Sequence, residues 1–176
     1  MKRSHLTLGA AILALGGYSG ASAEAQSGSV AATSTTDAEI VKMAGAPLFD
    51  GMGNYSRKIS TSSAAANRYF NQGMVLAFGF NHAESIRSFR AAQRLDPDCA
   101  MCFWGEALAT GPNINVTSKG KAVMSEADRK SAFAAINRAL ALKGTATPVE
   151  QALIEAQAKR YNGDAATDRS PLDLAY

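Results

Sequence analysis

The chain has 176 residues, which is enough for one domain with a modest hydrophobic core. Its 18 Lys and Arg against 15 Asp and Glu give a formal net charge of +3, and leaving out Lys2 and Arg3 at the N-terminus lowers this to +1. Because the rest of the chain has no cluster of basic residues, the composition does not indicate binding to nucleic acid or to an anionic surface.

The first 23 residues have the pattern of a secretory signal peptide. Lys2 and Arg3 precede an apolar run at 6–15, and Ala, Ser and Ala at 21–23 form a small-residue cleavage site. The apolar run is shorter than the roughly 20 residues that a membrane-spanning helix needs. We therefore predict an exported protein, periplasmic or secreted, with no membrane span in the mature chain.

Residues 24–60 are predicted to be a flexible leader followed by an irregular segment. Ser, Ala, Thr and Gly dominate 24–38, and such a stretch buries too little apolar surface to fold. From residue 39 onward apolar side chains return, but Gly45 and Pro47 interrupt any long helix. We expect this second part to be irregular and to pack onto the domain that follows.

Apolar residues at helical spacing then predict an all-α domain, because no useful stretch alternates at period two. Ser62 or Ser63 is a candidate N-cap for the first helix, Pro97 ends the second, and Gly111 with Pro112 ends the third. The expected helices are 64–80, 82–95, 98–110, 125–143 and 147–161.

Two stretches interrupt or follow these helices. The segment 111–124 is longer than helix pairs usually need, and a loop of that length can contact a ligand. Ser170 and Pro171 have the pattern of a further helix start within 166–176. A start signal so close to the last residue suggests a truncated chain.

Cys99 and Cys102 form a C-x-x-C pair at the start of the expected third helix. Export to an oxidising compartment favours a disulfide. A redox-active pair is an alternative, because a helix N-terminus lowers the pKa of a thiol, and copper binding is another, because Met101 lies between the two thiols. Phe103 stands where haem attachment needs His, and His82 adds too few ligands for a zinc site. We predict no cofactor, no metal and no enzymatic activity, with thiol–disulfide chemistry as the alternative.

Three other polar residues could carry chemistry. His82 stands at the start of the second expected helix, and Asp96 and Asp98 flank Pro97. Without a second His in the mature chain, we expect His82 to cap or pack at the helix start. The two Asp residues are expected to shape the turn and cap the next helix.

Residues 66–161 resemble tetratricopeptide repeat proteins, whose units are 34 residues long. Tyr69 and Phe103 lie one such period apart, although Gln72, Glu106 and Thr110 depart from the pattern and the second unit contains an insertion. The matching positions are Tyr69, Gly73, Leu76, Ser85, Phe89, Ala92 and Pro97 in the first unit and Phe103, Ala107, Ala132, Ile136 and Ala139 in the second.

The resemblance implies a short α-solenoid of stacked helix pairs over 61–165. The first helix of each unit would line a concave apolar groove that binds a protein or peptide, while Tyr69, Phe89 and Phe103 hold the units together. The alternative is a groove covered by residues 39–60 or by further chain. The groove residues implied are Phe70, Met74, Met101, Trp104 and Leu108.

From the sequence we therefore expect an exported scaffold that mediates protein–protein interaction. A periplasmic redox or copper-handling protein that uses Cys99 and Cys102 is the alternative. A structural piece of a larger solenoid is a third possibility.

Overall fold

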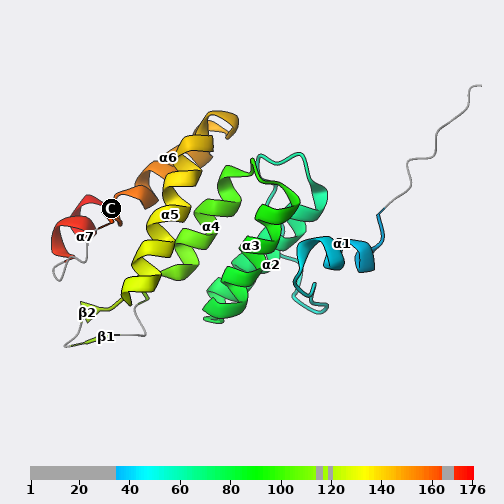
Figure 1. Cartoon of the computed structure of the whole chain (residues 1–176), viewed down its shortest axis with the longest axis horizontal. Coiled ribbons are helices and arrows are strands. Elements are labelled where there is room, and N and C mark those ends of the chain that lie inside the picture. The colour runs from blue at the N-terminus through cyan, green and yellow to red at the C-terminus, as the bar shows by residue number, and fades with distance from the viewer. Residues whose placement is uncertain (1–34, 114–116, 119–120, 164–168) are drawn as a thin grey trace, which may run out of the picture. The chain divides into compact units, whose positions relative to one another are not determined.

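The computed structural model describes residues 35–113, 117–118, 121–163 and 169–176 (Figure 1). All of them belong to one compact unit, Ser34–Tyr176. The predicted signal peptide at 1–23 and residues 24–34 of the predicted leader lie outside the described residues. So does part of the long loop at 111–124.

The described chain is all-α apart from one very short hairpin, as the sequence predicted. Strands β1 (Thr117–Ser118) and β2 (Lys121–Ala122) pair antiparallel within the long loop. None of the described helices is long and apolar enough to cross a membrane. The helices are α1 (Asp37–Ala44), α2 (Ala64–Phe78), α3 (His82–Leu95), α4 (Ala100–Thr110), α5 (Glu126–Leu142), α6 (Pro148–Ala158) and α7 (Ser170–Ala175), with the 3-10 turn η1 (Lys143–Thr145) between α5 and α6.

Local capping explains why the predicted boundaries of α2 to α6 lie close to the observed ones. The side chain of Ser63 accepts a hydrogen bond from the backbone N–H of Ala66 at the start of α2. Thr147 and Glu150 form a reciprocal capping box at the start of α6, where Pro148 occupies the first turn. These signals act over three residues, so they can be recognised without tertiary information.

The irregular structure predicted for residues 39–60 is wrong over its first part, because α1 runs from Asp37 to Ala44. A capping box of Thr36 and Glu39 starts this helix, and Gly45 ends it in the left-handed conformation, with φ of 62°. Gly45 therefore stops a short helix here, whereas the sequence interpretation took it as evidence against any helix.

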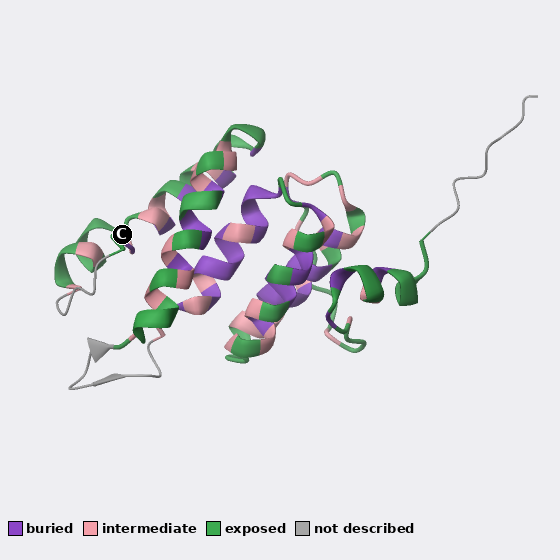
Figure 2. Cartoon of the chain, in the orientation of Figure 1, coloured by how far each residue is buried: buried purple, intermediate pink, exposed green. Residues whose placement is uncertain are grey.

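The helices α2 to α6 lie side by side, each packed against its neighbours in the sequence (Figure 1). Helix α4 also contacts α2 on one side and α6 on the other, and α1 packs against α3. Buried residues concentrate on the faces of α2, α3 and α4 that meet one another (Figure 2).

Phe89 of α3 occupies the centre of this core. A Cβ atom added to Gly73 of α2 would lie 2.8 Å from the Phe89 ring, and one added to Gly105 of α4 would lie 2.3 Å from it. The Phe70 ring meets Phe89 edge-on at a centroid distance of 5.6 Å. The two glycines therefore provide the space that lets three helices approach around one ring.

Replacing Gly105 by Ala is expected to lower the free energy of unfolding by about 1–3 kcal/mol, because the new methyl group overlaps the Phe89 ring and forces the core to shift. Urea unfolding followed by circular dichroism measures the change. Gly144→Ala is the matched control, since no atom lies within 4 Å of a Cβ placed there. Equal stability of the two variants would contradict the proposed packing role.

Candidate functional site

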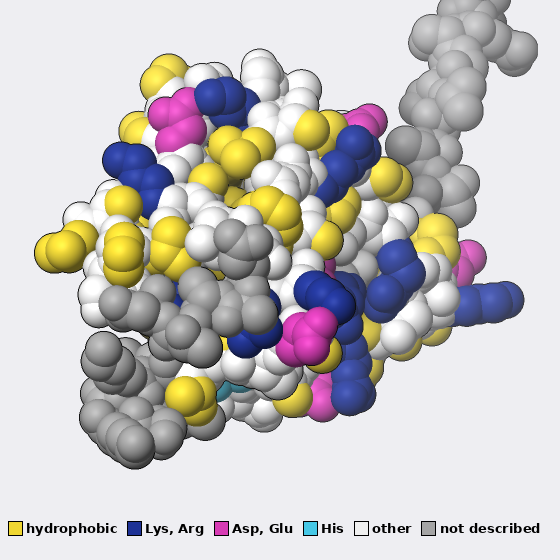
Figure 3. Space-filling model, turned by 60° about the vertical axis from the view of Figure 1, so that its left-hand side comes forward, with side chains coloured by type: hydrophobic (Ala, Val, Ile, Leu, Met, Phe, Trp, Pro, Cys, Tyr) yellow, Lys and Arg dark blue, Asp and Glu magenta, His cyan; other side chains and the backbone are white. Residues whose placement is uncertain are grey.

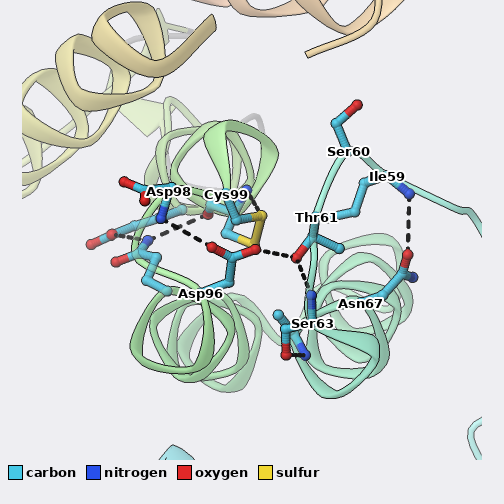
Figure 4. The surroundings of a disulfide bond; sticks show 12 residues. Ile59, Ser60, Thr61, Ser63, Asn67, Asp96, Asp98 and Cys99 are labelled. Carbon is cyan, nitrogen blue, oxygen red and sulfur yellow. Dashed lines mark hydrogen bonds between the residues drawn. A yellow bond between two sulfur atoms is a disulfide. The ribbon is translucent and has the colours of Figure 1, made fainter. Parts of the chain in front are cut away.

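Cys99 and Cys102 form the predicted disulfide at the start of α4, with an S–S distance of 2.05 Å and a Cα–Cα distance of 5.4 Å (Figure 4). Cys99 is also the N-cap of α4, because its Sγ accepts a hydrogen bond of 3.2 Å from the backbone N–H of Cys102. Both cysteines are 0% exposed. The bond therefore closes the first turn of α4 from within the core.

The burial of this disulfide limits what it can do chemically. Reactive cysteine pairs in oxidoreductases are partly exposed, since an incoming thiolate must reach one of the sulfurs. Here the first turn of α4 would have to open before that attack. Among the described residues there is no group of three or more His, Cys, Asp or Glu that could hold a metal ion.

The turn between α3 and α4 lies beside the disulfide and is held by Asp96. Its carboxylate accepts hydrogen bonds from the Thr61 hydroxyl and from the Asp98 N–H at 3.1 Å (Figure 4). It also accepts from the Ser62 N–H at 3.2 Å. Asp96 is the C-cap residue of α3, while the exposed Asp98 pairs with Arg138 of α5 at 3.6 Å. Both residues shape the turn, as the sequence predicted, but the prediction that they cap the next helix is wrong, because the N-cap of α4 is Cys99.

Glu150 is the second carboxylate that holds the chain segment preceding α2. It is 3% exposed, and Ser60 donates to it from both its N–H, at 2.9 Å, and its hydroxyl, at 2.6 Å. Thr147 donates to the same carboxylate from its N–H at 2.8 Å. Burial opposes ionisation, but the hydrogen bonds from Ser60 and Thr147 outweigh it and place the pKa of Glu150 below its usual range.

A shallow cavity of about 380 Å³ opens between the segment preceding α2, the α3–α4 turn and η1. Its hydroxyl and carboxylate groups can bind a polar molecule through hydrogen bonds. The lining residues are Ser60, Thr61, Ser62, Asp96, Asp98 and Thr145.

The apolar groove implied by the repeat resemblance is not an exposed surface. Phe70 and Met101 are 0% exposed, Met74 is 5% and Trp104 is 7%, and Leu108 is partly buried against the same core. The indole N–H of Trp104 donates to the backbone oxygen of Leu153 in α6 at 3.1 Å. The prediction that these five residues form an open binding groove is therefore wrong, because helix packing buries four of them.

His82 is the first residue of α3, but it does not cap the helix. The cap is Asn81, whose side chain accepts from the Glu84 N–H. The His82 ring meets Phe80 edge-on at 6.2 Å, and both of its ring nitrogens are buried without a hydrogen-bond partner among the described residues. Packing, one of the two roles predicted for His82, is the one that the structure supports.

An exposed aromatic cluster lies at the turn between α2 and α3, and the sequence interpretation missed it. Phe78 is 68% exposed, Phe80 is 61% and Tyr55 is 38%; we call these three residues the aromatic edge. Tyr55 packs edge-on against Phe78 at 6.5 Å. The signal in the sequence was the Phe-Gly-Phe run at 78–80, but the sequence interpretation placed all three residues inside the expected helix 64–80.

Phe80 is also the one described non-glycine residue with a positive φ, at 60°. This conformation closes the turn, because the Asn81 N–H then donates to Leu76 at the end of α2. The positive φ costs a bulky L-residue about 1–2 kcal/mol, and glycine in the same conformation would avoid this cost.

Charged side chains of both signs are mixed on the described surface that Figure 3 shows. On the face that Figure 3 shows, Lys and Arg alternate with Asp and Glu, and hydrophobic side chains lie between them. The ion pairs Lys143–Glu155 and Lys130–Glu126 follow the same pattern on the surface. This distribution agrees with a net charge close to zero and gives no support for binding a polyanion.

No protein-family model, curated protein or solved structure matches this chain. The resemblance to tetratricopeptide repeats therefore remains a prediction from the sequence pattern.

Replacing both cysteines by Ala is expected to lower the free energy of unfolding by about 3 kcal/mol. Loop-closure entropy for so short a loop gives about 2 kcal/mol of this, and loss of the Cys99 cap gives about 1 kcal/mol. The Cys99→Ser/Cys102→Ala variant should regain about 1 kcal/mol, because Ser caps a helix N-terminus well. Urea titration of both variants measures this. If both variants lose the same amount of unfolding free energy, the capping role of Cys99 is contradicted.

Glu150 is expected to make stability depend on pH. Because its folded-state pKa is lowered, its contribution is complete above the ordinary Glu value of about 4.3 and is lost as the pH falls through the folded value. The stability difference between the wild type and Glu150→Gln should therefore shrink on acidification. Unfolding free energies from pH 7 down to pH 3 test this, with the exposed Glu126→Gln as control. Parallel curves for wild type and Glu150→Gln would refute the assignment.

Proposed function

We propose that this protein is an exported, non-enzymatic scaffold with tetratricopeptide-like helix pairs, and that it binds a protein partner through its aromatic edge. The observation that carries the proposal is the exposure of Tyr55, Phe78 and Phe80 at one turn of an otherwise well-packed unit. Aromatic residues are enriched in protein–protein interfaces and often supply most of the binding energy.

The backbone of Phe80 adds a second reason. A bulky side chain in the left-handed conformation is unfavourable, and here that side chain is also exposed, so it contributes little to the core. Backbone strain of this kind is often found at functional positions. An interaction with a partner therefore explains the presence of phenylalanine at position 80 better than a role in folding does.

The packing of the helices supports the scaffold part of the proposal. Helix α4 contacts α2 and α6 while α3 and α5 lie between them in sequence, as expected when helix pairs stack. The repeat architecture itself rests on the spacing of the sequence motifs. The cysteine pair is buried and oxidised, so it does not support the redox or copper-handling alternative.

Phe80→Gly is expected to raise the free energy of unfolding by about 1 kcal/mol, because glycine adopts the positive φ without strain. The same substitution should reduce partner capture at least tenfold, since it removes an interface side chain. The measurement is quantitative affinity capture from the exported protein fraction of the source organism, alongside thermal unfolding.

Val149→Ala is the control, because Val149 is 65% exposed and lies on α6, away from the aromatic edge. It should leave capture unchanged. If Phe80→Gly and Phe78→Ala both capture the same proteins as the wild type, the aromatic edge is not the interface.

A further inference from the structure

The segment at 46–60, between α1 and α2, is held against α2 by contacts to its backbone. Asn67 of α2 donates to the Arg57 carbonyl oxygen at 2.8 Å and accepts from the Ile59 N–H at 3.1 Å (Figure 4 shows the second bond). One side-chain amide thus bonds residues 57 and 59, as a neighbouring strand would in a sheet.

Two further amides of α2 continue this pattern. Asn71 accepts from the Arg57 N–H at 3.0 Å. Gln72 accepts from the Phe49 N–H at 2.7 Å and donates to the Pro47 carbonyl oxygen at 3.1 Å. We call Asn67, Asn71 and Gln72 the amide row. Gln72 also donates to the Ser88 hydroxyl of α3 at 3.0 Å. The bonds from the row to the segment all go to main-chain atoms, so the row recognises a polypeptide backbone rather than particular side chains.

The side chains of the segment contribute little to holding it in place. Within 46–60, Ala46 is 5% exposed and Ile59 is 3% exposed, and the other residues are half-buried or exposed. Its two ends are fixed separately, by the Tyr69 hydroxyl on the Ala46 oxygen at 2.6 Å and by Glu150 on Ser60. A stretch with so few buried apolar contacts is the kind that opens locally while the core stays folded.

The surface around the amide row has room for another chain. One depression of about 210 Å³ is lined by Asn71 and Gln72 together with Phe49 and Tyr55 of the segment. A second, of about 460 Å³, is lined by Asn67 and Asn71 among others. The segment therefore fills its site incompletely.

We propose that the amide row of α2 is a binding site for an extended peptide backbone, and that residues 46–60 occupy this site as an internal competitor which a partner peptide displaces. The partner is a polypeptide segment in extended conformation with free N–H and C=O groups and an apolar side chain at the position of Ile59, which is 3% exposed. The amide row is a different surface from Phe78 and Phe80, although Tyr55 of the aromatic edge belongs to the displaced segment. The inference does not depend on partner binding at the aromatic edge.

Because the internal segment and the peptide compete for one site, the quantity to measure is the apparent affinity of the peptide. When the internal segment covers the site for most of the time, the apparent affinity of a peptide is lowered by the fraction of molecules whose site is open. A change that weakens the segment and leaves α2 unaltered must therefore strengthen peptide binding. A segment that merely caps the end of the helix stack would give no such gain.

The test uses the full chain and a fluorescent peptide with the sequence of residues 46–60. Arg57→Pro removes the N–H that Asn71 accepts, so it weakens the internal segment. We expect the peptide to bind this variant at least tenfold more tightly than it binds the wild type, measured by fluorescence anisotropy. Arg57→Ala keeps the N–H and should bind like the wild type. Adding Asn67→Ala to Arg57→Pro should abolish the gain.

Hydrogen exchange on the wild-type chain provides a second measurement that needs no variant. The amides of Phe49, Arg57 and Ile59 should exchange at least tenfold faster than the core amides of Phe89 and Ile136, because the segment opens without global unfolding. If these amides exchange at the core rate, or if the peptide gains no affinity for Arg57→Pro, the proposal is overturned. Neither result would decide whether Phe78 and Phe80 bind a partner.

Discussion

The close approach of α2, α3 and α4 around the Phe89 ring is the constraint on which the rest of this structure depends. With no side chain at Gly73 and Gly105, the backbones of two helices lie against the same aromatic ring. That approach also buries Phe70 and Trp104, which face the packed interior instead of a solvent-filled groove. The packing that stabilises the fold therefore removes the surface that the repeat resemblance suggested for binding.

The carboxylates of Asp96 and Glu150 link the helices to the segment that precedes α2. Asp96 holds Thr61 and Ser62, and Glu150 holds Ser60, so residues far apart in sequence meet at one end of the helix stack. Burying a polar group without a hydrogen-bond partner is costly, so these donors offset the cost of burying the two carboxylates. The same end contains the buried disulfide, which strengthens the α3–α4 turn.

Two surfaces stand out after the core and these anchors are accounted for. The aromatic edge exposes large apolar side chains that contribute little to the fold, and the amide row binds main-chain atoms of the chain's own segment. Both lie on or beside α2, and both are surfaces for which we propose an interaction with another polypeptide. The Phe89 packing and the two carboxylates, by contrast, hold the helices and the segment before α2 together.

The sequence by itself determined the features that depend on neighbouring residues. Cap residues and proline placed most boundaries of α2 to α6 within a few residues. The short spacing of Cys99 and Cys102, together with the predicted export, favoured the disulfide over the redox and copper alternatives. Helix α1 was missed because Gly45 and Pro47 were read as breakers of a longer helix. Only the tertiary structure decided which faces are buried, since the period of a helix marks its apolar face but not what covers it. The burial of Trp104, the exposure of Phe80 and the contacts of Asn67 with residues 57 and 59 all depend on how the chain packs.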